Sequence, residues 1–268
     1  MKKYIYTLLA CYAFTGIAQE DDTTRVNLGG MEVLVIDKKK DANDTIDAAP
    51  DHDPDEDEHK LIGEGHWGGI DFGPTILMNS AMKTQFPDQP QWQNDPGKSF
   101  YWNINIFDTR LNVYKEYVGI TTGFGINFTQ IGIKNNEILM ESPDSLWFVK
   151  DSVNVYSKNK LRGTYLQVPL LIEFNTNKKE SKSFYLATGV IGGVRVGSAL
   201  IQKVDNNGSR KKEKYKGTYG LQAFKADATV RMGYSRWGLF ANYALIPLFD
   251  TNLTSEAYPL TFGLTYNF

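Results

Sequence analysis

The segment YPLTFGLTYNF, residues 258–268, decides the fold because two kinds of side chain alternate along its whole length. Its even positions are apolar or aromatic, whereas Thr261, Gly263, Thr265 and Asn267 occupy the odd positions. A period of two residues is typical of a β-strand whose two faces meet different surroundings. The segment therefore predicts a strand with one apolar face and one small, polar face.

The same alternation recurs upstream, so we expect an all-β fold with eight antiparallel strands. Long connections follow the first, third, fifth and seventh strands, and short ones follow the others, as in an up-and-down barrel. Residues 131–160 contain LWFV and VNVY, so an extra hairpin that brings the count to ten strands stays open. The expected strands cover roughly residues 66–78, 100–112, 118–129, 165–174, 185–196, 224–234, 237–248 and 258–268.

The size of the apolar side chains indicates which face of the strands points out of the barrel. Phe, Tyr, Trp, Leu and Val line one face, and they are too large for the narrow interior of an eight-stranded barrel. Glycines, hydroxyls and charges line the other face and suit a crowded interior. We therefore expect a transmembrane β-barrel in an outer membrane, with its apolar faces toward lipid. A soluble, lipocalin-like barrel with an apolar interior is the alternative.

The N-terminal segment MKKYIYTLLACYAFTGIA, residues 1–18, predicts a secretory signal peptide that is cut before Gln19. Two lysines precede an apolar stretch that ends in small residues. A lipoprotein cleavage site at residues 8–11 is the alternative, although the apolar stretch before it is short. Cleavage before Gln19 removes Cys11, the single cysteine, and thereby excludes disulfides and thiol chemistry from the mature chain.

Two further segments precede the barrel. Residues 24–36, within the segment 19–36, carry β-prone residues on both sides of two glycines and predict a periplasmic β-hairpin. Residues 37–64 predict an acidic, disordered linker, because residues 37–60 hold ten acids against four lysines. The barrel domain then covers residues 65–268.

The end of the chain fits a second pattern, polar-x-Gly-x-x-aromatic-x-aromatic, formed by Thr261, Gly263, Tyr266 and Phe268. This pattern resembles the sorting signal that outer-membrane barrels present to the barrel assembly machinery. The resemblance implies that this machinery is a partner of the chain.

Four stretches also carry a family resemblance: YLQVPLL at residues 165–171, residues 185–189, RMGY at 231–234 and PLTFGL at 259–264. In these stretches the chain resembles the PorT-like outer-membrane β-barrel proteins of Bacteroidetes. The resemblance covers about residues 65–268 and implies the same barrel fold. It also allows a part in protein secretion, which only some members of that family have.

Charge and histidine content argue against two classes of function. The formal net charge of −2 gives no basic excess for a nucleic-acid partner. The three histidines are His52 and His59 in the acidic linker and His66 at the start of the first strand, so no histidine dyad or triad is expected in the upper barrel. We therefore expect no enzyme and no cofactor. His52, His59 and the acids around them are spaced too irregularly for a metal site, and weak polyelectrolyte binding is expected instead.

The charged residues of the polar faces are the candidate site. Three acids and three bases are expected to pair inside the barrel and close its lumen, because an unpaired charge there is costly. A proton or ion path is the alternative. This lumen charge network consists of Asp71, Glu173, Arg195, Lys225, Asp227 and Arg231.

These patterns predict a non-enzymatic outer-membrane barrel with a structural or interaction role. Its long loops face outward, both termini lie in the periplasm, and its partners include outer-membrane lipid. The segment 203–216, with six basic residues, is a candidate contact for lipopolysaccharide phosphates, or else an ordinary solvated loop. A narrow transport pore and an accessory subunit of a secretion or surface machine are the alternatives.

Overall fold

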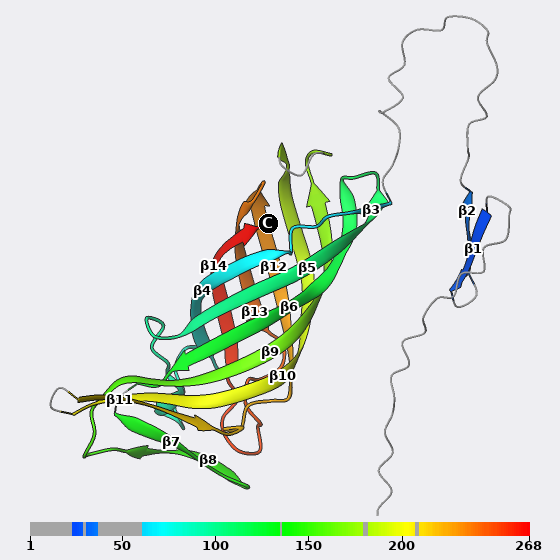
Figure 1. Cartoon of the computed structure of the whole chain (residues 1–268). Helices are drawn as coiled ribbons and strands as arrows, with labels where there is room; N and C mark the ends of the chain where they lie inside the picture. Colours follow the sequence, from blue (N-terminus) through cyan, green and yellow to red (C-terminus); the bar gives the residue numbers. More distant parts are fainter. Residues whose placement is uncertain (1–22, 29–30, 37–60, 135, 179–181, 207–208) are drawn as a thin grey trace, which may run out of the picture. The chain divides into compact units, whose positions relative to one another are not determined.

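The computed structural model describes residues 23–28, 31–36, 61–134, 136–178, 182–206 and 209–268 (Figure 1). The chain divides into two units, Met1–Glu56 and Asp57–Phe268, and each is described by itself. The predicted signal peptide and residues 37–60 of the predicted acidic linker lie outside the described residues. Among the helices of the described ranges, none is long and apolar enough to cross a membrane.

The described residues of the first unit form an antiparallel pair of strands, β1 (Thr23–Leu28) and β2 (Met31–Ile36). The pairing runs from Thr23 opposite Ile36 to Leu28 opposite Met31. These strands occupy the segment for which the sequence predicts a hairpin.

The second unit is a closed ring of eight antiparallel strands, as predicted (Figure 1). Each strand pairs with the next one in the chain, and the last strand, β14, pairs with the first, β4. All strands of an up-and-down barrel find two partners, so the ring has no open edge. The ring consists of β4 (Gly69–Met78), β5 (Phe100–Tyr114), β6 (Val118–Gly132), β9 (Tyr156–Asn175), β10 (Phe184–Asn206), β12 (Phe224–Tyr234), β13 (Trp237–Ala244) and β14 (Tyr258–Asn267).

The segment between β6 and β9 decides between eight and ten strands. It contains β7 (Glu137–Ser142) and β8 (Ser145–Lys150), which pair with each other. This hairpin forms a sheet of its own and adds no strand to the ring. The barrel therefore has eight strands rather than ten, and the extra hairpin lies in its longest loop.

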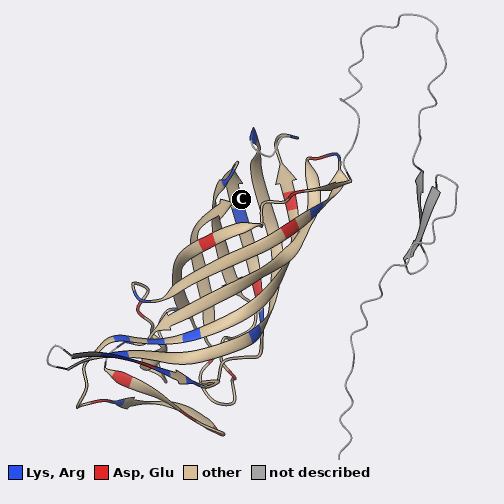
Figure 2. Cartoon of the chain, viewed as in Figure 1, with Lys and Arg blue, Asp and Glu red and all other residues tan. Residues whose placement is uncertain are grey.

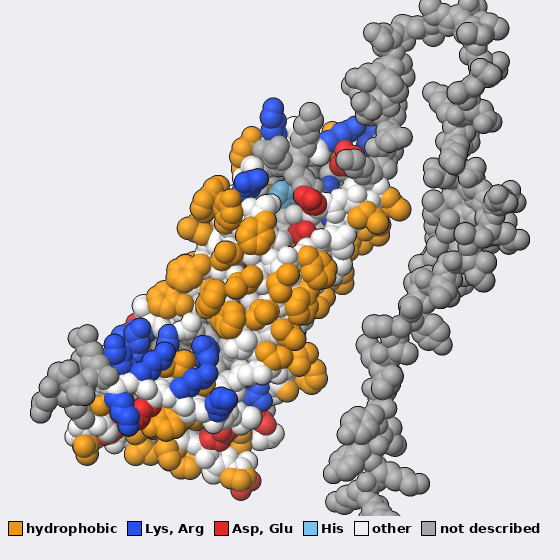
Figure 3. Space-filling model, in the orientation of Figure 1, with side chains coloured by type: hydrophobic (Ala, Val, Ile, Leu, Met, Phe, Trp, Pro, Cys, Tyr) orange, Lys and Arg blue, Asp and Glu red, His pale blue; other side chains and the backbone are white. Residues whose placement is uncertain are grey.

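The two faces of the strands point as the alternation predicts. In β9, Leu171 and Glu173 are buried, whereas Leu170, Ile172 and Phe174 are exposed. Figure 3 shows that hydrophobic side chains cover the visible part of the barrel wall. Such a surface suits lipid, because large exposed apolar areas are rare on soluble monomers.

Three of the strand boundaries that differ from the prediction lie in β9, β10 and β13. β13 ends at Ala244 rather than near residue 248, and β9 begins at Tyr156, before the expected start. β10 runs on to Asn206 and pairs there with β11 (Ser209–Lys216), so much of the predicted loop 203–216 is a strand pair. Charged side chains on both faces of β11 hid this hairpin from the sequence pattern.

A β-bulge in β5 changes which residues point into the barrel. The register with β6 shifts between Asn105 and Phe107, so Ile106 and Phe107 both lie exposed. Residues with odd numbers point into the barrel before the bulge, and residues with even numbers point inward after it. Arg110 therefore points inward, and only 2% of its surface is exposed. A bulge inserts one extra residue and is invisible to a strict period of two.

The end of the barrel with the long connections is closed by an apolar cluster, which we call the loop cap. The ring of Trp92, in the short helix η1 (Pro90–Trp92), packs at a tilt against the ring of Phe249, with centroids 4.1 Å apart. The Trp92 indole Nε1 donates a hydrogen bond to Thr254 at 2.7 Å. The loop cap comprises Leu77, Phe86, Trp92, Ile131, Ile133, Leu139, Leu146, Leu161, Leu200, Tyr219, Leu221, Leu248, Phe249 and Ala257.

Candidate functional site

The centre of the lumen holds a buried ion pair between Arg231 of β12 and Asp71 of β4. Arg231 Nη1 lies 3.0 Å from Asp71 Oδ2, and Nη2 lies 2.5 Å from Oδ1. Both side chains are fully buried. Asn103 and Asn105 each donate a hydrogen bond of 3.1 Å to Asp71 Oδ2, and the guanidinium lies 4.8 Å from the ring of Trp67. The pair is thus compensated in charge, while the buried Arg231 Nε has no hydrogen-bond partner among the described residues.

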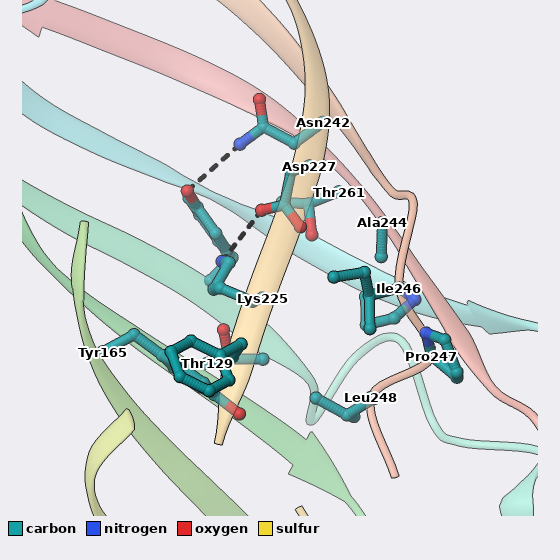
Figure 4. Close-up of a pocket in the computed structure, with 13 residues that line it drawn as sticks. Thr129, Tyr165, Lys225, Asp227, Asn242, Ala244, Ile246, Pro247, Leu248 and Thr261 are labelled. Atoms are coloured by element: carbon teal, nitrogen blue, oxygen red, sulfur yellow. Dashed lines mark hydrogen bonds and ion pairs between the residues drawn. The ribbon is translucent and has the colours of Figure 1, made fainter. Parts of the chain in front are cut away.

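A second pair lies nearer the loop cap, where Lys225 Nζ contacts Asp227 at 2.8 Å (Figure 4). The ammonium also lies 5.3 Å from the ring of Tyr101 and 5.4 Å from that of Tyr165, which are cation–π distances. The cavity beside these residues has a volume of about 20 Å³. That is room for about one water molecule. Lys225 and its neighbours therefore fill most of the lumen at this level.

The third group surrounds Glu173, near the end of β9 that leads into a short connection. Its carboxylate accepts hydrogen bonds from Arg110 Nη1 at 3.0 Å and from Thr121 Oγ1 at 2.8 Å. It also contacts His66 Nδ1 at 2.7 Å and accepts the His66 backbone N–H at 3.0 Å. The His66 ring stacks on Tyr185 with centroids 4.0 Å apart. His66 lies before β4, three residues ahead of Gly69, so the expectation that it begins the first strand is wrong.

The segment that leads into β4 is held in the same mouth of the barrel by a carboxylate. Asp108 Oδ2 accepts the backbone N–H groups of Trp67 at 2.8 Å and Gly68 at 2.7 Å, and Oδ1 accepts that of Gly65 at 3.4 Å. The Trp67 side chain is fully buried and packs in a small apolar cluster with residues of β9 and β10. The lumen is thus occupied at this end by the chain's own entry segment.

The structure divides the predicted charge network into separate groups. It brings Asp71 to Arg231 and Lys225 to Asp227, but it gives Glu173 partners from outside the predicted set. Arg195 corrects the prediction most clearly, because no described carboxylate forms an ion pair with it. Its Nη1 donates instead to the carbonyl groups of Thr218 at 3.2 Å and Leu221 at 2.6 Å, below the loop cap.

The alternation of the sequence does not indicate the partners of Glu173. Arg110 follows the bulge in β5, so its inward orientation did not show in the alternation. His66 and Trp67 lie in the entry segment, which has no periodic pattern. The inward asparagines and threonines were visible as polar positions, but their hydrogen bonds depend on the ring order of the strands.

The hairpin β7–β8 is fastened to the loop that follows β11 through Glu141. This carboxylate accepts hydrogen bonds from Thr218 Oγ1 and from the Gly220 backbone N–H, the latter at 2.9 Å. Burial alone would raise the pKa of Glu141, but these hydrogen bonds outweigh it and lower the pKa. The ionised form of Glu141 is therefore the form that holds the hairpin.

The four residues of the predicted sorting signal lie on β14 and just beyond it. Thr261 Oγ1 faces the lumen and lies 3.0 Å from Thr75 Oγ1. The Tyr266 ring packs on Trp237, with centroids 4.9 Å apart, and the Phe268 side chain is 68% exposed.

Gly263 lies where β14 passes β4. A Cβ atom on Gly263 would lie 2.1 Å from the Phe72 carbonyl oxygen, and one on Gly73 would lie 2.0 Å from the Phe262 carbonyl oxygen. Only glycine permits this close approach of the two backbones.

Metal-ligating groups do not gather in the part of the chain that the structure describes: no three His, Cys, Asp or Glu residues lie together there in a way that fits a metal ion. His52 and His59, with the acids around them, fall outside the described residues. The described interior therefore presents ion pairs and hydrogen bonds between its own side chains.

A closed ring of eight strands with an apolar outer wall and a polar interior defines the class of transmembrane β-barrels. Residues 68–252 match the family described as outer membrane protein beta-barrel domain. Because this match covers more than half of the chain, the chain belongs to that family.

Two solved structures that are similar to the chain are crystal structures of Ail, the attachment invasion locus protein of Yersinia pestis, one of them in complex with the heparin analogue sucrose octasulfate. Both are 14% identical to it over 75% of this chain, with a TM-score of 0.29. The alignments cover 99% and 96% of the two Ail chains. A TM-score this low supports no argument about function. No curated protein matches the chain.

Proposed function

We propose that this protein is a closed, non-enzymatic outer-membrane barrel with a structural or interaction role. Its lumen serves as a rigid interior, and its outer surface and long loops make the functional contacts. The observation that carries this proposal is the fully buried pair of Asp71 and Arg231, which lies across the middle of the lumen. An ion path would need water around these charges, whereas both are enclosed by protein.

Both ends of the lumen support the same proposal. The loop cap fills the end with the long connections, and Trp67 fills part of the other. The space beside Lys225, about 20 Å³, is far smaller than the bore that a transport barrel needs at that level of the lumen.

The test of closure is the electrical conductance of the purified barrel in planar lipid bilayers. We expect no steady single-channel current from the wild-type protein. Large, stable currents would reject the closed barrel and favour the alternative of a narrow pore. A heat-dependent shift in gel migration, measured on the same preparation, reports that the barrel is folded.

The orientation and partners follow from the same proposal. An even number of strands returns both termini of the barrel to one side, which is the periplasm when the long loops face outward. We propose outer-membrane lipid and lipopolysaccharide as the surroundings, with no nucleic-acid partner, and the barrel assembly machinery as the partner that reads the C-terminal pattern.

The PorT-like resemblance supports a second candidate, an accessory subunit of a protein secretion or surface machine. The groove between the β7–β8 hairpin and β10–β11, with a volume of about 780 Å³, offers such a machine a docking place. Co-purification after mild detergent extraction separates the two roles. A stoichiometric protein complex favours the subunit, and a barrel recovered alone favours a structural role.

A further inference from the structure

Seven basic side chains form three rows on the outer face of the sheet where β9, β10 and β11 extend past the apolar wall. In the first row Lys158, Lys203 and Lys212 lie directly opposite one another. In the second row Lys160 and Lys214 flank Ile201, and in the third Arg162 and Lys216 flank Ala199. We call these seven residues the basic grid. Figures 2 and 3 show Lys and Arg gathered over these strands.

Within the part of the chain that the structure describes, the basic grid lacks internal charge compensation. Among the described residues, no carboxylate forms an ion pair with any of its seven members. Lys160 donates a hydrogen bond to the neutral side chain of Gln130. The acid of β11, Glu213, points to the opposite face and pairs with Lys211 at 2.7 Å. Like charges directly opposite one another in a sheet are unfavourable, so the grid favours an external anion.

The basic grid lies at the edge of the lipid-facing wall. Along β9, the outward residues from Leu166 to Phe174 are apolar, and they span about 27 Å of strand. This length suits the apolar band of a tilted strand in an outer membrane. Arg162 follows at the end that carries the long loops, which is the outward end in such barrels. The grid therefore lies at the level of the outer-leaflet headgroups.

A hollow of about 220 Å³ opens within the grid, beside Arg162, Lys214 and Lys216. Gly197 lies in its wall at a β-bulge of β10, where a Cβ atom would meet no other atom within 4 Å. The hollow therefore has free space between three cations. A guanidinium that binds two oxygens and ammonium groups that act as point charges are the usual partners of phosphate.

We propose that the basic grid binds the phosphate groups of an anionic lipid in the outer leaflet, with one phosphate in the hollow beside Arg162. This inference rests on the membrane-embedded barrel proposed above. The sequence predicts a phosphate contact from the segment 203–216 alone. The basic grid also includes Lys158, Lys160 and Arg162, which come from β9. Juxtamembrane basic clusters attract anionic headgroups in this way.

The test measures binding of lipid A by the full-length barrel in phosphatidylcholine nanodiscs. We expect lipid A to bind wild type and to raise its thermal stability, with binding that weakens as salt is added. The double variant Lys160→Gln/Lys214→Gln should bind about thirtyfold more weakly, which corresponds to about 1 kcal/mol for each lost charge. Unchanged affinity in this variant would overturn the proposal.

The matched control is Lys182→Gln/Lys211→Gln, which changes the net charge equally. Lys182 lies in the β9–β10 connection, and Lys211 points away from the grid. We expect wild-type affinity from this control, and an equal loss would show a general charge effect and reject the site. Inorganic phosphate that competes as strongly as lipid A would reject a lipid site in favour of a free-phosphate site.

The outcomes also separate this inference from the proposed function. Heat-shifted migration of every variant checks that each one is folded. A wild-type protein absent from the outer-membrane fraction would refute the membrane-embedded barrel itself. A folded, non-conducting barrel in that fraction that shows no preference for lipid A would refute the lipid site alone.

Discussion

Arg231 of β12 donates two hydrogen bonds to Asp71 of β4, from Nη1 to Oδ2 at 3.0 Å and from Nη2 to Oδ1 at 2.5 Å. The two strands lie three positions apart in the ring. The pair crosses the lumen and connects opposite parts of the wall. Replacing one partner leaves the other as a buried, unpaired charge. We expect Arg231→Gln to destabilise the barrel by about 3–5 kcal/mol. Denaturant unfolding in lipid or detergent measures this loss.

Two matched variants sharpen that prediction. Asp71→Asn/Arg231→Gln removes both charges and should restore part of the lost stability, because no unpaired charge remains. Arg195→Gln should cost less than Arg231→Gln, since the hydrogen bonds of Arg195 go to backbone carbonyls and no described carboxylate forms an ion pair with it. A double variant as unstable as Arg231→Gln alone would contradict the ion-pair account.

The carboxylate of Asp108 should hold the entry segment in the barrel mouth. Asp108→Asn keeps the size of the side chain but replaces one acceptor oxygen with a donor, so the hydrogen bonds from Trp67 and Gly68 are lost or weakened. We expect faster amide hydrogen exchange at residues 65–68 and unchanged exchange in β12 and β13. Wild-type exchange rates at residues 65–68 would show that other contacts hold this segment.

The loop cap should depend on Phe249, which is fully buried against Trp92. Phe249→Ala removes a large side chain from a packed cluster, at a cost of about 3–5 kcal/mol. We expect proteases to cut the long loops while the barrel stays folded on the gel. Trp147→Ala, at a side chain that is 41% exposed, is the control and should leave the loops resistant.

Acid should loosen the β7–β8 hairpin. Because folding lowers the pKa of Glu141, its carboxylate stabilises the attachment above the ordinary pKa of 4.5, and this contribution is lost as the pH falls through the lowered value. Hydrogen exchange of residues 137–150, corrected for intrinsic rates, should rise in that range. Glu141→Gln should remove the pH dependence. A variant with the wild-type pH profile would assign the effect to another group.

Phe268 should matter for assembly more than for stability. Its side chain is 68% exposed, so Phe268→Ala removes little packing from the folded barrel. The sorting pattern nevertheless predicts a lower yield of folded barrel in the outer membrane, with a nearly unchanged unfolding midpoint for the molecules that fold. The solvent-exposed Tyr114→Ala variant is the control. An unchanged yield of Phe268→Ala would argue against the sorting role.

The barrel was predictable from the sequence because each wall residue meets either lipid or a crowded interior. The alternation of apolar and polar side chains in residues 258–268 follows directly from these two environments. Contacts between distant strands were less accessible. Glu173 and Arg110 meet only because a bulge in β5 reverses the facing of one strand end. The basic grid was divided in the sequence between two segments, residues 158–162 and 203–216, which only the strand pairing unites.

The contact between β4 and β14 has a consequence for the order of folding events. It joins Gly69 to Asn267, which lie near the two ends of the barrel sequence. The ring is closed by the pairing of β14 with β4, so it stays open until β14 has been synthesised and delivered. During that interval two strand edges lack partners and are exposed to other chains. The arrival of β14 therefore determines how long these two edges stay open to wrong pairing.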